Sequence, residues 1–374
     1  MDLKHIKNNE PQAASEILSA FAENPKLPRR KVLSLLAAVV LTSCSSGKSE
    51  KNAKKTHNES NLAYPYSGSR FLTSIPQGKI INGVTIENID TDLSLIDQFE
   101  TKTAKKIGIS QVYKGWGSED TLNGTFIQTL AAKNIATIIT WEPFDSRRDD
   151  KINQPEYSLR RLIDGTYDKY IINSAKEARK IKTEFILRVG AEFNTGGTSF
   201  SIGQNGNKIG EYGAFLSYVM KIFDQVGANN VIFAFNPNIP TNDSPSIKAE
   251  YPKYIPRNIR LIMALDGYNS IAYNGKSLSF KELFSQGYAE LMQLNPSAPF
   301  LIPEFGCDDV DGIDKSGWIL DAYEHAKQNF PNLFGLVYYD ENYNGKFGLE
   351  SSPKSLAAFT KAMQNPNILD TATV

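Results

Sequence analysis

Short apolar runs alternate with amphipathic segments through most of the chain, and this alternation limits the fold more than any other feature. From residue 70 onward there are eight strand-like runs: Phe71–Ile75, Ile107–Tyr113, Ala136–Thr140, Phe185–Val189, Val231–Phe235, Ile259–Leu265, Phe300–Ile302 and Phe334–Tyr338. Most are nearly continuous in Ile, Val, Leu and Phe. Runs of this kind are typical of parallel strands that are covered on both faces.

Helical patterns lie between these runs, most clearly at Tyr167–Lys182, Glu211–Val226, Phe280–Leu294 and Gly317–Asn329. Strand and helix alternating eight times over roughly 300 residues predict an α/β fold, a (β/α)8 TIM barrel, as a single domain. An open doubly wound sheet is the alternative. None of these runs, however, is followed by the Gly-x-Gly-x-x-Gly turn with which such sheets bind dinucleotides.

The first part of the chain carries an export pattern. Three basic residues from Arg29 precede the apolar run Val32–Val40, which is too short for an ordinary transmembrane helix and is followed by Leu41-Thr42-Ser43-Cys44. This ending resembles a bacterial lipobox, which implies a lipid on Cys44 and a lipoprotein of the cell envelope, at the outer membrane or cell surface. We therefore expect an N-terminal extension and signal peptide over residues 1–43, a flexible linker over 44–63 and one barrel domain over 64–374.

Charge and residue counts exclude several kinds of function. Lys plus Arg and Asp plus Glu are both 41, so no net field attracts nucleic acid. Only His325 of the three histidines lies in the predicted domain, which argues against the usual zinc sites and Ser-His-Asp triads. With Cys44 assigned to the lipid, Cys307 has no partner for a disulfide. Acid–base chemistry in this domain is thus expected from carboxylates, without a cofactor.

Polar and aromatic side chains gather where the apolar runs stop. Glu192 and Asn194 follow the fourth run, Glu304 follows the seventh, and Trp116 and Trp141 follow the second and third. Barrel enzymes keep their active sites at the C-terminal ends of the strands. Two carboxylates there suggest paired acid chemistry, and Trp rings cover the apolar faces of sugars. The sequence therefore predicts Glu192 and Glu304 as a catalytic pair, with Trp116 and Trp141 binding substrate.

Five of these strand ends resemble the motifs of family 26 glycoside hydrolases. Members of that family are retaining (β/α)8 enzymes that cleave β-mannans, mixed-linkage β-glucans or β-1,3-xylan. The segments that carry the resemblance are Ile139–Pro143 (Ile-Thr-Trp-Glu-Pro), Arg188–Asn194 (Arg-Val-Gly-Ala-Glu-Phe-Asn), Asn230–Asn238, Asp266–Tyr268 (Asp-Gly-Tyr) and Pro303–Gly306 (Pro-Glu-Phe-Gly). They occur in the family's order, and the similarity covers most of residues 70–355.

The resemblance implies a retaining endo-β-glycanase that works by double displacement. Glu192 would be the general acid/base and Glu304 the nucleophile. Such a pair needs one ionised carboxylate and one carboxyl that stays protonated, about 5–5.5 Å apart. The fourth and seventh strands of a barrel can supply that spacing.

The resemblance also implies the residues around this pair. Tyr268 would hydrogen-bond the nucleophile and keep it ionised, while Arg188 and Asn194 would shape the site. Tyr338 or Tyr339 would be the aromatic platform for the sugar at the point of cleavage. Because successive strand residues point to opposite faces, at most one of these two tyrosines should face the site.

Two departures from the family pattern leave the substrate open between β-mannan and mixed-linkage β-glucan. Ala191 stands where the family has His, and Gly197 where it has Trp. The alternative hypothesis is a catalytically impaired lipoprotein that binds polysaccharide on the same barrel. A barrel enzyme for another substrate class is a third hypothesis, although no phosphate cradle follows the last strands. The expected partners are a polysaccharide and a membrane, the latter through Cys44, and we expect a monomer that does not bind nucleic acid.

Overall fold

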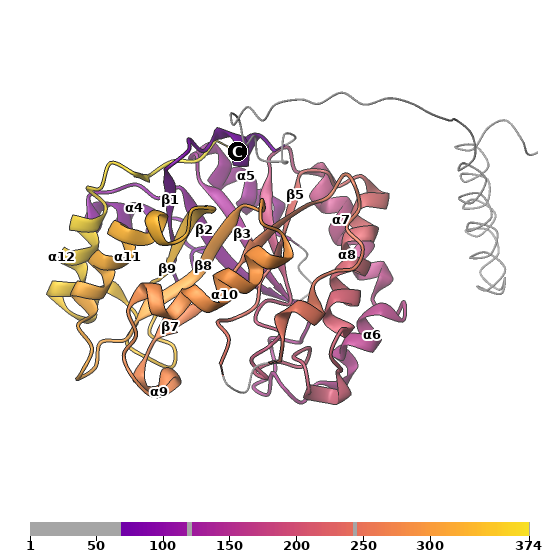
Figure 1. Cartoon of the computed structure of the whole chain (residues 1–374). Helices are drawn as coiled ribbons and strands as arrows, with labels where there is room; N and C mark the ends of the chain where they lie inside the picture. Colours follow the sequence, from indigo (N-terminus) through magenta and orange to yellow (C-terminus); the bar gives the residue numbers. More distant parts are fainter. Residues whose placement is uncertain (1–68, 118–121, 242–244, 374) are drawn as a thin grey trace, which may run out of the picture. The chain divides into compact units, whose positions relative to one another are not determined.

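The computed structural model describes residues 69–117, 122–241 and 245–373, and within them a parallel barrel closes on itself (Figure 1). Its eight strands, in barrel order, are β1 (Ile80–Thr85), β2 (Ile109–Gly115), β3 (Ala136–Glu142), β4 (Phe185–Val189), β5 (Val231–Phe235), β6 (Arg260–Ala264), β8 (Phe300–Cys307) and β9 (Leu333–Tyr339). Closure comes from pairing of β9 with β1, in register from Ile81 with Gly335 to Thr85 with Tyr339. The predicted (β/α)8 TIM barrel is confirmed.

Two short strands extend this barrel. β7 (Gly267–Asn269) continues from the end of β6 and pairs with the last residues of β8, and β10 (Ile368–Leu369) pairs with the start of β1. Both pairings are parallel. β7 therefore lengthens the barrel wall at the C-terminal mouth.

Helices surround the strands. The longer ones are α4 (Ser94–Thr103), α5 (Gly124–Ala132), α7 (Asp168–Lys180), α8 (Glu211–Val226), α10 (Phe280–Leu294), α11 (Lys315–Asn329) and α12 (Pro353–Ala362). Shorter ones are α3 (Arg70–Ser74), α6 (Leu159–Ile163), α9 (Ile271–Asn274) and the single turns η2 (Pro155–Tyr157), η3 (Gln204–Gly206), η4 (Ile247–Glu250) and η5 (Leu349–Ser351). Figure 1 shows α7 and α8 side by side at one edge of the barrel and α11 and α12 at the other.

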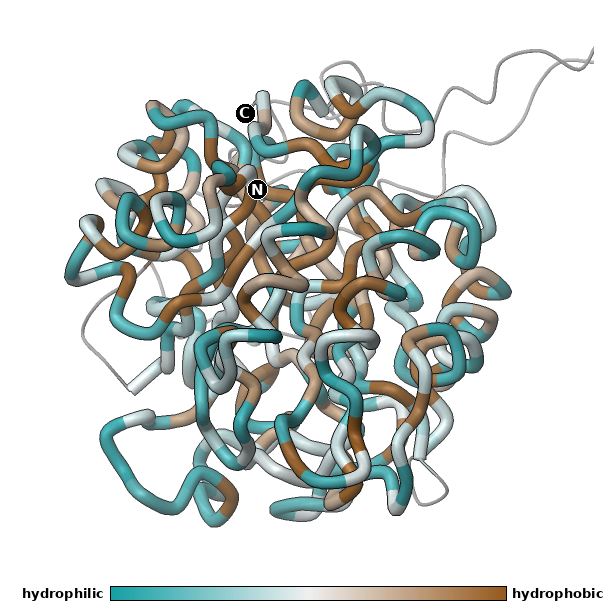
Figure 2. The backbone as a smooth tube through the Cα atoms, turned by 90° about the vertical axis from the view of Figure 1, so that its left-hand side faces the viewer, coloured by the Kyte–Doolittle hydropathy of each residue, from teal (hydrophilic) through white to brown (hydrophobic). Residues whose placement is uncertain are grey.

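Burial of apolar side chains creates two separate cores, because both faces of the parallel sheet are covered. The smaller core fills the barrel and is made mainly of Ile81, Ile109, Ile138, Ile186, Ile232, Ile262 and Val337. The larger core lies between the strands and the helices. Figure 2 shows hydrophobic segments gathered inside and hydrophilic ones on the outer turns and loops.

The prediction of the first strand was wrong. Phe71–Ile75 lies mostly in helix α3, which begins where the Ser69 hydroxyl accepts a hydrogen bond from the Leu72 amide. The true first strand, β1, contains Asn82 and Gly83 and lacks a continuous apolar run. Gly83 is required there because a Cβ would lie 2.8 Å from the Cβ of Ile109 on the neighbouring strand.

The predicted signal peptide, the linker and the lipid site at Cys44 lie outside the described residues, so they stay predictions. Among the residues that are described, no helix is long and apolar enough to cross a membrane. Cys307 is fully buried, and burial raises the pKa of its thiol to about 12, as expected for a small core residue without a reactive thiolate.

Candidate active site at the mouth of the barrel

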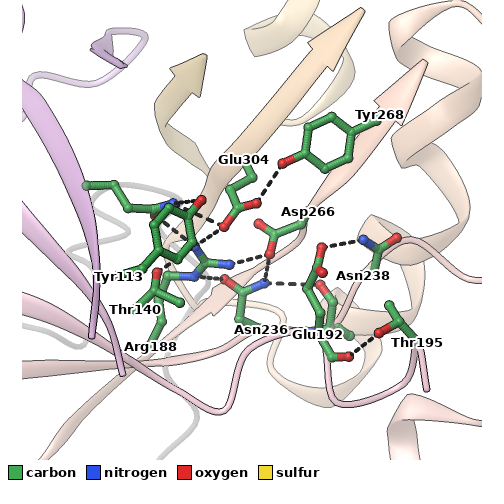
Figure 3. A network of polar contacts seen from close by, with 12 residues as sticks. Tyr113, Thr140, Arg188, Glu192, Thr195, Asn236, Asn238, Asp266, Tyr268 and Glu304 are labelled. Carbon is green, nitrogen blue, oxygen red and sulfur yellow. Dashed lines mark hydrogen bonds and ion pairs between the residues drawn. The ribbon is translucent and has the colours of Figure 1, made fainter. Parts of the chain in front are cut away.

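A network of charged and polar side chains lies at the C-terminal ends of the strands (Figure 3). Arg188 is the fourth residue of β4, and Glu304 lies within β8. Asp266 follows β6, and Tyr268 lies in β7. These elements are parallel, so their C-terminal ends meet at one mouth. The fold thus brings together side chains that are more than a hundred residues apart in the chain.

Glu304 is held by donors on both carboxylate oxygens. Arg188 Nη1 and Gln111 Nε2 donate to Oε1 at 2.6 Å and 3.0 Å, and the Tyr268 hydroxyl donates to Oε2 at 2.6 Å. Only 7% of the residue is exposed. Three donors, one of them cationic, stabilise the ionised form of a carboxylate. Glu304 is therefore fixed in place by three donors at the mouth of the barrel.

Arg188 is the cation of the network and is completely buried. Its guanidinium also donates to Asp266, and through Nε to Asn236 Oδ1 at 2.7 Å. Burial opposes the charge on the guanidinium, but the Asp266 and Glu304 carboxylates outweigh it and raise the pKa of Arg188. Because the side chain is buried and its nitrogens have partners, Arg188 is not exposed at the mouth. It acts on the substrate site through Glu304.

Glu192 follows the end of β4 in an unusual backbone conformation. Its φ is +56°, two residues after Gly190 at +59°, and its amide donates to Asn236 O at 2.8 Å. A left-handed residue other than glycine is uncommon and costs energy. This turn directs the carboxyl group into the mouth, where it accepts a hydrogen bond from Asn238 Nδ2.

The electrostatic surroundings of Glu192 differ from those of Glu304. The pKa of Glu192 is raised to about 7: burial and the negative charge of Glu304 raise it, and the hydrogen bond from Asn238 and the charge of Arg188 oppose them in part. Near neutral pH a large share of this carboxyl group is thus protonated. The two glutamates thus have different surroundings: Glu192 accepts from one neutral amide, whereas Glu304 accepts from a guanidinium, an amide and a hydroxyl.

A third carboxylate, Asp266, lies between them. One oxygen from each of Glu192, Asp266 and Glu304 lies within 4.8 Å of the others. Burial raises the pKa of Asp266 well above its usual value, although the charge of Arg188 opposes this. Three carboxylates this close could ligate a divalent cation, but Arg188 already donates to two of them. The spacing of Glu192 and Glu304 fits a nucleophile and an acid/base better than it fits a pair separated by a water molecule.

Asn194 supports the site through two hydrogen bonds to the main chain of Asn238. Its Oδ1 accepts from the Asn238 amide at 2.8 Å, and its Nδ2 donates to Asn238 O at 3.0 Å. Both polar atoms are therefore used, and 5% of the residue is exposed. The structure places Asn194 as a support for Asn238, which contacts Glu192.

The predictions for Trp116 and Trp141 were also wrong. Trp141 is completely buried and stacks on Tyr170 of α7, with ring centroids 5.6 Å apart. Trp116 packs on Trp141 at 4.6 Å and contacts Phe215 of α8. Both indoles belong to the core between strands and helices and do not line the mouth. Alternation along β3 is the reason, because Thr140 points inward to Arg188 and its neighbour must point outward.

The two tyrosines at the end of β9 divide in the same way. Tyr338 is completely buried against Phe305 and Phe359 in the outer core, so it is not the sugar platform. Tyr339 points to the mouth, where its ring lies 5.5 Å from that of Tyr268 in an edge-to-face contact. Tyr268 and Tyr339 are thus the predicted substrate-binding residues that the structure places beside Glu304.

Several residues of the network were not assigned a role from the sequence, among them Gln111, Asp266 and Asn238. Gln111 lies in the middle of β2, and its carbonyl oxygen accepts from Arg188 Nη1 at 2.7 Å while its amide donates to Glu304. Asp266 and Asn238 were visible only as members of strand-end motifs. A buried polar residue inside an apolar strand, such as Gln111, is the signal that could have pointed to the site.

Comparisons with known proteins agree with this architecture. No known family profile matches the chain. Over 276 residues the sequence is 26% identical to "Endoglucanase H" of Acetivibrio thermocellus, and the aligned region covers 72% of this chain and 29% of that protein. The chain therefore spans less than a third of the length of that relative.

Solved structures with the same fold include two mannanases. A GH26 β-mannanase from Bacteroides ovatus superposes with a TM-score of 0.58 at 14% identity, over 78% of this chain and 90% of that one. An endo-β-1,4-mannanase from Cellulomonas fimi gives 0.59 at 12% identity, over 78% and 72%. The YdhT protein of Bacillus subtilis gives 0.55 at 14%, over 81% and 89%. At these identities the likeness establishes the barrel fold.

Proposed function

We propose that the chain is a retaining endo-β-glycanase of glycoside hydrolase family 26. The observation that carries the proposal is the pair Glu192 and Glu304 at the barrel mouth, with oxygens within 4.8 Å and opposite electrostatic surroundings. Inverting enzymes keep their carboxyls about 6.5–9.5 Å apart to admit a water molecule, whereas retaining enzymes bring them closer. The similarity to an endoglucanase and the fold shared with mannanases support the same class.

In the first step Glu304 attacks the anomeric carbon, and Glu192 gives its proton to the leaving glycosidic oxygen. A covalent glycosyl ester forms on Glu304 as the C–O bond to the leaving sugar breaks. In the second step Glu192, now ionised, removes a proton from water while the water oxygen displaces Glu304. Arg188 and Tyr268 stabilise the Glu304 carboxylate before attack and after release.

A β-linked polysaccharide is the proposed substrate, either β-mannan or mixed-linkage β-glucan. Tyr339 and Tyr268 offer ring faces at the mouth. Ala191 presents a methyl group where the resemblance leads one to expect an imidazole, and Gly197 presents no side chain where it leads one to expect an indole. Loss of these two groups is the specific feature that favours the alternative, a barrel that binds polysaccharide without cleaving it.

A reducing-sugar assay of the full chain against β-mannan, mixed-linkage β-glucan and β-1,3-xylan tests the proposal. Glu192→Ala and Glu304→Ala should each lose hydrolysis, while Glu324→Ala, on the exposed face of α11, should keep it. Azide separates the two roles: it should rescue Glu304→Ala with an inverted glycosyl azide and Glu192→Ala with a retained one. Binding of a glycan without hydrolysis, unaffected by either substitution, would favour the alternative.

We further propose that the chain is exported and anchored through a lipid on Cys44, as a monomer in the cell envelope. The lipobox-like segment Leu41–Cys44 supports this part of the proposal. Incorporation of radiolabelled palmitate into the wild-type chain but not into Cys44→Ala would test the anchor, and light scattering after detergent extraction would test the monomer. Labelling that persists in Cys44→Ala would refute the anchor.

A further inference from the structure

A lysine ammonium is buried beside the mouth, and the proposed reaction does not use it. Lys315 is the first residue of α11 and is 3% exposed. Its Nζ donates to three main-chain carbonyls, those of Lys346 at 2.8 Å, Phe347 at 3.0 Å and Gly348 at 2.7 Å, and to the Ser351 hydroxyl at 2.8 Å. Four oxygens around one cation resemble the way a loop holds a metal ion. Here the cation belongs to the chain.

This position is unfavourable for a lysine on general grounds. The first turn of a helix carries a partial positive charge that repels cations, and burial removes the ammonium from water. Carboxylates compensate in part, because Asp308, Asp309 and Asp340 lie near the ammonium. The contribution of the Lys315 ammonium to the structure must therefore come from the groups that it binds.

The groups that Lys315 binds belong to the segment 340–352, which connects β9 to α12. Other bonds also fold this segment: Asp340 accepts from the Leu349 amide at 2.6 Å and Asn342 Oδ1 from the Gly348 amide at 3.1 Å. These bonds use amide groups of the segment. Lys315 instead donates to three main-chain carbonyls of the segment, and one of these, Phe347 O, also accepts from the Tyr338 hydroxyl at 2.9 Å.

The segment carries Phe347 into the wall of the site. Phe347 is 1% exposed, and its ring centroid lies 4.9 Å from that of Tyr268 and 6.3 Å from that of Tyr339. Its ring also covers Gly306, two residues after Glu304, where a Cβ would meet it at 3.1 Å. Phe347 is therefore the surface against which Tyr268 rests while its hydroxyl donates to Glu304.

We propose that Lys315 is a positioning residue for the reaction: its ammonium binds main-chain carbonyls of the segment 340–352 and so holds Phe347 against Tyr268 and Tyr268 on Glu304. This inference rests on the proposed function. Lys315 touches neither substrate nor the reacting atoms, and its effect passes through the main chain of residues 346–348 and the ring of Phe347.

The chain offers a matched control on the same helix. Lys327 is a half-buried residue of α11, and its Nζ donates to a main-chain carbonyl, Leu333 O, at 2.6 Å. Leu333 is the first residue of β9, at the end of the barrel remote from the mouth. Lys327→Met thus removes a half-buried, carbonyl-bound ammonium from α11 without touching the segment 340–352.

The test combines kinetics on a cleaved glycan with hydrogen exchange, using the full chain. Lys315→Met should lower kcat about tenfold with KM nearly unchanged, since the Tyr268–Glu304 bond is loosened but the sugar surface remains. Amide exchange in residues 340–352 should speed up in the same variant. Lys327→Met should keep the kcat and the exchange of the wild type, and Lys315→Arg should recover part of both.

Chemical rescue decides whether the ammonium itself is required. Lys315→Ala leaves a space of the shape of n-propylammonium, which should restore kcat and slow the exchange, whereas n-propanol should not. Wild-type kcat and exchange in Lys315→Met, or an equal loss of kcat in Lys327→Met, would overturn the role of Lys315. Absence of hydrolysis by the wild-type chain would instead overturn the proposed function, and this inference with it.

Discussion

Removing one hydroxyl, in Tyr268→Phe, tests how far Glu304 depends on its donors. The hydroxyl donates to Glu304 Oε2 at 2.6 Å, while Arg188 and Gln111 donate to Oε1. The substitution keeps the ring, so the packing against Phe347 and Tyr339 survives. A hydrogen bond to a charged group contributes about 1.5–3 kcal/mol. At about 1.4 kcal/mol for each factor of ten, kcat/KM should fall roughly 10- to 150-fold.

The assay is kcat/KM on the glycan that the wild-type chain hydrolyses fastest, with the thermal midpoint measured beside it. Tyr288→Phe is the matched control, because its hydroxyl donates to Asn332 Oδ1 at 3.3 Å, next to the first residue of β9 and remote from Glu304. That variant should stay close to the wild-type value. A Tyr268→Phe chain that keeps full activity, while Glu304→Ala is inactive, would show that Arg188 and Gln111 suffice and would refute the reasoning.

Three further predictions follow from the same geometry. Because the general acid Glu192 must carry a proton, kcat/KM should fall as the pH rises through about 7, the pKa of Glu192. Asn238→Ala removes the hydrogen bond to Glu192 that lowers this pKa, so the decrease in kcat/KM should occur at higher pH in that variant. Arg188→Met should lower the free energy of unfolding in urea by about 3–5 kcal/mol, since it strands the buried carboxylates of Asp266 and Glu304. Trp141→Phe should lower the free energy of unfolding by about 0.5–3 kcal/mol in the same assay and leave KM unchanged. A raised KM would show that Trp141 contacts the substrate after all.

Most of the barrel was predictable because its strands are buried on both faces. β4 (Phe185–Val189) and β5 (Val231–Phe235) match their predicted bounds, since each is a continuous apolar run with a clear end. β1 was missed because its interior contains Asn82 and Gly83. Close contact with β2 requires the glycine, and this requirement comes from a strand pair that a single run of residues does not reveal.

The charged part of the site was predictable for a related reason. Glu192 and Glu304 stand at the ends of apolar strands, and parallel strands bring such ends to one mouth. The direction in which a side chain points was harder to predict than its position at a strand end. Trp141 and Tyr338 each lie next to a residue that faces the barrel interior or mouth, Thr140 and Tyr339, and strand alternation turns them outward. Fixing that alternation on Arg188, and carrying it to β3 through the pairing of Thr140 with Arg188, would have shown that Trp141 points outward.

The energetics of the network also bear on the two proposed functions. Burying Arg188 with Asp266 and Glu304 costs desolvation that their attraction hardly exceeds, and apolar side chains of similar volume would stabilise a barrel as well or better. Glu192 adds the cost of a left-handed backbone and of a carboxyl buried near two others. A barrel that only holds sugar needs hydroxyl-binding groups facing the mouth, and Arg188 does not face it. In bond cleavage, by contrast, both glutamates have a role: Glu304, bound by Arg188, Gln111 and Tyr268, attacks the sugar, and Glu192 supplies a proton. The hydrolase hypothesis therefore explains why the chain keeps these unfavourable features, and the binding hypothesis does not.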